Sequence, residues 1–243
     1  MTMVALEDLY RPYRPKRRTR ATIAKEKGLE PLAEILRAQA TTRTIEEEAT
    51  AFVDAEKGVE SVQDAIDGAK DILAEVYADD ADYRTKLRAM TKESGSLVAK
   101  AKDEEADSVY EMYYDFSEPI KKLVGHRILA INRGEAEKFL TVKIEAPRQE
   151  ILLWLVKQII GNMKHDSASY LYEAITDSYD RLIAPSIERE IRNELTEKAE
   201  EGAIGVFGKN LHQLLMQPPI SGQVLLGWIR DLHTEAKLGS VRR

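Results

Sequence analysis

The segment from Leu9 to Ala33, LYRPYRPKRRTRATIAKEKGLEPLA, marks the point where a basic, proline-containing run gives way to a helical pattern. Residues 11–20 hold six cations and no acid, although the 243-residue chain has a net charge of −6. Proline fixes φ and removes a backbone donor, which favours an extended arm with splayed side chains. We therefore predict an extended basic arm over residues 1–21. Its candidate phosphate-binding residues are Arg11, Arg14, Lys16, Arg17, Arg18 and Arg20.

The same arm has a second interpretation, which the sequence leaves open. It could be a strap that lies on the domain surface and pairs with acidic helices elsewhere in the protein. Directly after the arm, Gly28 and Pro31 divide Thr22–Ala40 into two short helices. These helices could form a helix-turn-helix-like element or could simply pack on the core. No obvious set of base-reading side chains marks either as a recognition helix.

The region 22–110 is predicted to be helical. Apolar residues at three- and four-residue spacing predict a long amphipathic helix over Phe52–Tyr77, with an interruption near Gly58. Further helices are expected over Tyr83–Thr91 and Ser94–Asp107.

Residues 111–147 form a mixed segment with one small β element near 126–144. The sequence Asn-Arg-Gly ending at Gly134 resembles a turn, and Leu140–Ile144 alternates apolar with polar residues, so we predict a β element or a helix followed by a strand. A nearby aromatic cluster could stack on bases or fill a core. Its members are Tyr110, Tyr113, Tyr114 and Phe116.

Residues 148–220 are predicted to form a helical bundle. Arg148–Gly161 is so rich in apolar residues that we expect a helix buried nearly all round. Gly202 and Gly205 indicate a junction before another apolar helical face over Val206–Met216. The predicted fold class is therefore mainly α, a multi-helical bundle with one small β element, and 43% hydrophobic residues suffice for its core.

The sequence carries few signs of catalytic chemistry. The histidines are scattered, and the sequence contains no HExxH, no phosphate-binding loop, no GxGxxG and no GxSxG. The acidic run Asp103–Asp107 is interpreted as a hydrated face. We expect no enzymatic activity, no metal and no cofactor. The absence of cysteine and of an apolar run of about 20 residues predicts a cytoplasmic protein without a membrane span.

Four long blocks of this sequence, in order, resemble the Tex family, bacterial RNA-binding transcription accessory proteins. The blocks are PYRPKRRTRATIAKEKGLEPLA, Phe52–Glu75, Tyr113–Ile144 and Ser178–Pro219. Tex proteins also carry a YqgF-type RNase H-like domain, helix-hairpin-helix elements and a C-terminal oligonucleotide-binding domain with much of the RNA affinity. The resemblance implies that this chain is the part that precedes the RNase H-like domain and that Met1 is an internal start.

The resemblance stops after Gln217–Gly227. Tex-like sequences continue there with Leu-Asp-Pro-Gly and an aromatic residue, whereas this chain has Trp228–Leu232. One possible coding sequence for the family motif gives Trp-Ile-Arg-Asp when it is read one nucleotide later. We therefore expect residues 221–243 to be an aberrant tail, in which Trp228–Arg243 are frameshifted and pack poorly.

Two functional hypotheses follow. In the first, the chain is a fragment of a transcription accessory protein whose arm binds RNA or DNA phosphates weakly and without sequence preference, with the transcription machinery as a possible partner. Its affinity should fall with salt, because bound counterions are released. In the second, the chain is a helical protein-interaction scaffold or a non-functional gene fragment that does not bind nucleic acid.

Overall fold

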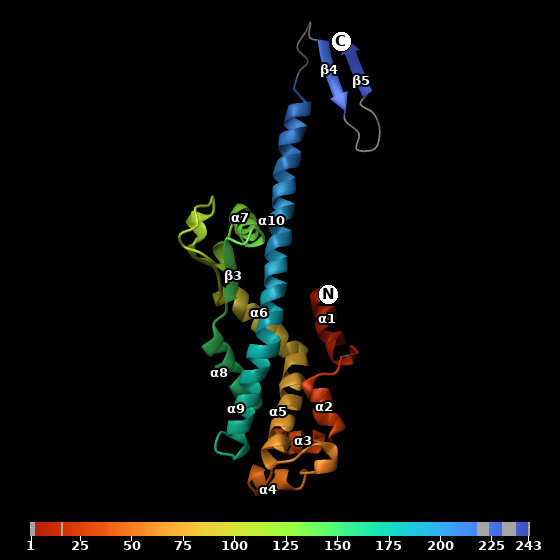
Figure 1. The fold of residues 1–243 in the computed structure, drawn as a ribbon, viewed down its shortest axis with the longest axis vertical. Coiled ribbons are helices and arrows are strands. Elements are labelled where there is room, and N and C mark those ends of the chain that lie inside the picture. Colours follow the sequence, from red (N-terminus) through yellow and green to blue (C-terminus); the bar gives the residue numbers. More distant parts are fainter. Residues whose placement is uncertain (1–2, 16, 218–223, 230–236, 243) are drawn as a thin grey trace. The chain divides into compact units, whose positions relative to one another are not determined.

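The computed structural model describes residues 3–15, 17–217, 224–229 and 237–242 and confirms the mainly α fold (Figure 1). Its α-helices are α1 (Met3–Tyr10), α2 (Arg20–Glu26), α3 (Glu30–Ala38), α4 (Ile45–Thr50), α5 (Val62–Asp79), α6 (Ala81–Ser94), α7 (Gly125–Ala136), α8 (Arg148–Ile159), α9 (Ser167–Asp177) and α10 (Ala184–Leu215). Short 3-10 helices are η1 (Arg11–Tyr13), η2 (Ala55–Lys57), η3 (Glu111–Tyr113) and η4 (Ile120–Lys122), and η5 (Ser178–Ile183) is a π-helix. The strands are β1 (Ser96–Ala101), β2 (Asp115–Pro119), β3 (Leu140–Glu145), β4 (Val224–Ile229) and β5 (Lys237–Arg242).

Helix α5 lies at the centre of the N-terminal helices and contacts α2, α3, α4 and α9 (Figure 1). It begins later than predicted, because Gly58 adopts a left-handed conformation with φ 72° and Ser61 then caps the helix by accepting from the backbone N–H of Asp64. The predicted helix is thus confirmed from Val62 onward. Residues 52–61 form a turn and the short helix η2 instead.

The two short helices predicted around Gly28 are present as α2 and α3. Gly28 has φ +83°, and the Leu29 N–H donates to the Ala24 carbonyl at 3.2 Å, which closes α2 with a left-handed turn. Exposed Glu30 and Glu34 lie on α3, where they would repel phosphate. This arrangement supports the packing interpretation of the pair.

The β element is larger than predicted. Strand β1 lies between β2 and β3 in an antiparallel sheet, with Ser96 paired to both Pro119 and Glu145. The predicted helix over Ser94–Asp107 is therefore wrong. Three consecutive residues of β1 are buried, so the strand lacks the alternation that distinguishes a half-buried strand from a helix.

Helix α7 precedes β3, which confirms the alternative of a helix followed by a strand. The predicted turn ending at Gly134 is wrong, because α7 continues through it to Ala136. Gly134 packs closely instead. A Cβ there would lie 2.7 Å from Leu140 Cδ1 and 3.1 Å from Tyr110 Cδ1, so this glycine allows the helix to approach its neighbours.

Helix α8 is amphipathic and not buried all round as predicted. Ile151, Leu152 and Leu155 face the core, whereas Leu153 is 62% exposed. The apolar composition of this segment overestimated its burial, because an apolar side chain on the outer face of a helix can remain exposed to solvent.

The chain divides into two compact units, Met1–Glu200 and Glu201–Arg243. The predicted junction at Gly202 and Gly205 is wrong, since α10 runs through both without a break. Within the second unit the side chains of the predicted apolar face over Val206–Met216 are exposed, namely those of Val206, Phe207, Leu211, Leu214, Leu215 and Met216. Strands β4 and β5 pair antiparallel. Of the predicted aberrant tail, residues 221–223, 230–236 and 243 lie outside the described residues, and so do residues 218–220 of the predicted bundle.

The exposed glycines of α10 are positions at which alanine should stabilise the helix. A Cβ added at Gly205 meets no atom within 4 Å. The Gly205→Ala substitution should therefore raise the free energy of opening of this helical segment by about 1 kcal/mol, because alanine loses less backbone entropy on folding. Amide hydrogen exchange of the neighbouring residues measures it. Slower exchange is expected, and faster exchange would show that another group packs on this glycine.

Candidate nucleic-acid interface

The basic arm is less extended than its prolines suggested. Residues 3–10 form α1 and residues 11–13 form η1, so the prediction of an extended arm over 1–21 is wrong for this part. Pro12 lies in the first turn of η1, where its missing N–H has no helical partner to lose. Arg14 is extended, with φ −69° and ψ 131°, and so is Thr19, the N-cap of α2, with φ −98° and ψ 167°.

A buried charge network anchors the base of the arm. Asp8, near the end of α1, accepts from Arg84 Nε and Arg88 Nη2 of α6, both at 2.7 Å. The same arginines bind Glu190 of α10, at 2.5 Å from Arg84 Nη2 and at 2.9 Å from Arg88 Nε. Arg84 Nη2 also donates to Ser186 Oγ at 3.0 Å. The two guanidinium groups and two carboxylates thus form a closed ring that joins α1 to α6 and α10.

This network is well shielded from water. The side chain of Arg84 is 0% exposed and that of Asp8 is 4% exposed. Burial opposes the charged form of Arg88, but its hydrogen bonds to Asp8 and Glu190 outweigh burial and raise its pKa. The ring was not visible in the sequence, because Asp8, the two arginines of α6 and Glu190 lie far apart along the chain.

Part of the arm faces the acidic surface of α5, as the strap interpretation requires. Arg11 Nε lies 3.3 Å from Asp79 Oδ1, and Thr19 Oγ1 donates to Glu75 Oε2 at 3.3 Å. Burial and the nearby charge of Arg84 lower the pKa of Arg11. Arg11 is therefore a structural contact and is a poor candidate for binding phosphate.

The remaining predicted cations differ in whether acidic side chains already neutralise them. Arg18 forms a long, exposed ion pair with Glu26 at 3.6 Å, and such pairs contribute little. Arg20 begins α2 in an open hollow shared with Asp71 and other acids. Arg14 and Arg17 are exposed and make no ion pair within the described part of the chain. Lys16 lies outside the described residues. Arg14 and Arg17 are thus best placed to meet a phosphate, with Arg18 next.

Two tyrosines of the arm were missed as candidates. Tyr10 is 57% exposed and Tyr13 is 79% exposed, beside the cations. The alternation Tyr-Arg-Pro-Tyr-Arg was the available signal. The aromatic cluster that was considered instead belongs to the core: Tyr110 and Tyr113 are buried, and Tyr113 packs on Phe116 with ring centroids 5.5 Å apart. The core alternative for that cluster is confirmed.

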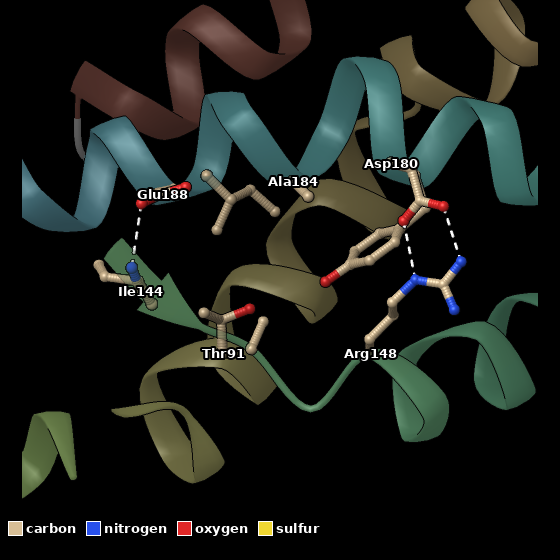
Figure 2. A pocket seen from close by; sticks show the side chains of 9 residues that line it. Thr91, Ile144, Arg148, Asp180, Ala184 and Glu188 are labelled. Atoms are coloured by element: carbon tan, nitrogen blue, oxygen red, sulfur yellow. Dashed lines mark hydrogen bonds and ion pairs between the residues drawn. The ribbon is translucent and has the colours of Figure 1, made fainter. Parts of the chain in front are cut away.

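A small cavity between β3, α8 and the start of α10 offers no catalytic arrangement (Figure 2). Its volume is about 170 Å³. Arg148 binds Asp180 through two hydrogen bonds of 2.9 and 2.7 Å, and Glu188 accepts from the Ile144 N–H at 3.0 Å. Burial raises the pKa of Tyr179 to about 12, so its hydroxyl stays protonated. The charged groups of this cavity are paired with structural partners.

The residues that the structure describes contain neither a metal-binding cluster nor a membrane-spanning helix. In that part of the chain, His, Asp and Glu side chains form no group of three that could hold a metal ion. None of the helices described there is long and apolar enough to cross a membrane.

The chain is similar to a family model and to several known proteins. Residues 40–207, more than half of the chain, match the family model described as Tex central region-like. The chain is 47% identical over 236 residues to the uncharacterized protein YdcI of Bacillus subtilis, 33% identical over 257 residues to Protein tex of Bordetella pertussis, and 32% identical over 241 residues to the human S1 RNA-binding domain-containing protein 1.

These alignments cover nearly all of this chain but a minor part of each relative. They include 96%, 100% and 93% of the chain, and 33%, 32% and 24% of the respective relatives. The chain therefore spans about a third of the length of the curated relatives it matches, or less.

Proposed function

Because the chain belongs to the Tex family, whose central region it matches over residues 40–207, we propose that it is a transcription accessory module that binds the phosphate backbone of RNA through its arm. The observation that carries this proposal is the pair of exposed arginines, Arg14 and Arg17, which have no ion-pair partner among the described residues. Arg18 adds a third cation whose ion pair is weak enough to exchange for a phosphate.

The way the arm is held supports the proposal. The arm is attached at both ends, by Asp8 to Arg84 of α6, which also binds Glu190 of α10, and by Thr19 to Glu75 of α5. Its cations are therefore partly ordered before they meet a ligand, which lowers the entropic cost of binding. The helices act as the scaffold that presents the arm.

Relatives named for transcription or RNA binding support the same class of function. Similar proteins include the Transcriptional accessory protein Tex of Neisseria gonorrhoeae and the human protein named for an S1 RNA-binding domain. We assign no reaction to this chain, and we propose that it acts in the cytoplasm with the transcription machinery as its protein partner. Binding through phosphates carries no sequence preference.

Neutralising the arm tests the proposal. The double substitution Arg14→Gln and Arg17→Gln should weaken binding to a short single-stranded RNA about tenfold at low salt. It should also reduce the slope of log affinity against log salt by about 1.4, because two phosphate contacts are lost. Fluorescence anisotropy with labelled RNA over a salt series measures both quantities.

A matched control separates the arm from the net charge. Arg43→Gln with Arg189→Gln removes the same charge from exposed positions outside the arm and should leave the affinity nearly unchanged. The proposal fails if the wild-type chain shows no binding at low salt, or if the control weakens binding as much as the arm variant.

A second function is favoured by one observation, the contact of Arg11 with Asp79. If the whole arm is a strap, the chain is a protein-interaction scaffold that does not bind RNA. The same anisotropy measurement distinguishes the two, since the scaffold predicts no binding by the wild-type chain even at low salt.

A further inference from the structure

Tyr10 and Tyr13 differ from most tyrosines of this chain. Tyr110, Tyr113 and Tyr179 bury their rings in the core. Tyr10 and Tyr13 instead expose 57% and 79% of their surface, and within the described residues neither side chain makes a hydrogen bond or a ring contact. An exposed aromatic ring leaves apolar area available for a ligand.

The backbone places these two residues on the same side of the turn. Tyr10 is the N-cap of η1 and Tyr13 is its last residue. Side chains at positions i and i+3 of a 3-10 helix lie on the same side, about 6 Å apart along the axis. Pro12 fixes φ between them, and Arg11 binds Asp79 on α5. The turn therefore presents the two rings while Arg11 holds it on the domain.

The spacing of the two residues along the turn suits a base as ligand. Successive bases in a strand are separated by about 3.4 Å. The axial spacing of about 6 Å between Tyr10 and Tyr13 is therefore close to the thickness of two stacked bases. Exposed Arg14 follows Tyr13 directly and can meet the phosphate next to a stacked base. Cations interleaved with aromatic rings are the usual surface for unpaired nucleic acid.

We infer that the arm selects single-stranded nucleic acid by stacking unpaired bases on Tyr10 and Tyr13. This inference rests on the proposed function, and adds bases to the phosphates as a source of affinity. A duplex offers the same phosphates, but its base faces are already covered by their neighbours. The arm should therefore bind a single strand more tightly than a duplex.

The experiment compares three labelled probes of about 12 nucleotides: single-stranded RNA, the corresponding duplex, and an abasic strand that keeps the sugars and phosphates. The wild-type chain should bind the single strand about a hundredfold more tightly than either other probe, because two stacking contacts are available only there. Tyr10→Leu and Tyr13→Leu should each weaken single-strand binding about tenfold. Neither should change binding to the abasic strand or the salt slope.

A matched control and the phosphate variants complete the design. Tyr172→Leu changes a tyrosine of α9 that is 49% exposed and lies outside the arm, and should leave all affinities unchanged. The inference is overturned if Tyr10→Leu and Tyr13→Leu behave like Tyr172→Leu while Arg14→Gln with Arg17→Gln still weakens binding. That result would leave the proposed function intact. Absence of binding to every probe would overturn both.

Discussion

Replacing Arg84 by methionine should lower the free energy of unfolding by about 3–5 kcal/mol, because it breaks a buried ion network by removing one partner. Arg84 is fully buried and binds Asp8, Ser186 and Glu190. Without it, the nearly buried carboxylate of Asp8 keeps Arg88 as its one ion-pair partner among the described residues. Methionine fills much of the space but cannot donate a hydrogen bond, so the lost energy is mainly that of an incompletely paired charge.

Urea denaturation followed by circular dichroism measures this change. The matched control is Arg133→Met, since Arg133 pairs with Glu137 on the exposed surface of α7. That pair should contribute less than about 0.5 kcal/mol. Equal effects of the two substitutions would contradict the view that burial gives the Arg84 network its importance.

A second variant distinguishes the net contribution of the network to stability from the destabilisation caused by leaving one buried charge without its partner. When all four charged members are replaced together by apolar residues, no buried charge is left without a partner, and much of the lost stability should return. The members are Asp8, Arg84, Arg88 and Glu190. A variant as unstable as Arg84→Met would show that the ion pairs stabilise the fold in their own right.

The fold was predictable where burial follows a period. Helix α5 buries Ala65, Ile66, Ala69, Ile72 and Leu73 on one face, and this spacing is visible in the sequence. Strand β1 was missed because its centre is buried on both faces, and an apolar run of that length is compatible with a helix or a strand. Pairing with β2 and β3 makes this segment a strand, and that pairing depends on residues outside β1.

Only the amino-acid composition of the candidate site could be predicted from the sequence, not its arrangement in space. The density of cations in the arm was evident from the sequence, but the sequence does not show which of them point to the domain. Arg11 meets Asp79, which lies far along the chain, whereas Arg14 remains free of the described acids. Local sequence could not separate them, because the difference arises from the packing of α1 and η1 on the helices. The exposure of Tyr13 has the same origin.

Gly95, between α6 and β1, gives the last prediction, in which a single methyl group should be costly. A Cβ at this position would lie 2.4 Å from the Thr91 carbonyl oxygen, 3.1 Å from Ile120 Cδ1 and 3.2 Å from the Glu145 carbonyl oxygen. Two of these atoms belong to the backbone, so no side-chain rotation relieves the overlap. We expect Gly95→Ala to lower the free energy of unfolding by about 3 kcal/mol, measured by urea denaturation.

The control for Gly95→Ala is the same substitution at Gly205, where the added methyl group meets no atom within 4 Å. The two changes are chemically identical, yet their expected effects have opposite signs. The Gly95 N–H also donates to the Thr91 carbonyl at 2.8 Å, and its carbonyl accepts from the Ile120 N–H at 3.0 Å. Both bonds would be strained if the chain moved to make room. A Gly95→Ala variant as stable as the wild type would mean that α6 and the sheet can separate slightly at no cost, and that this junction is not closely packed.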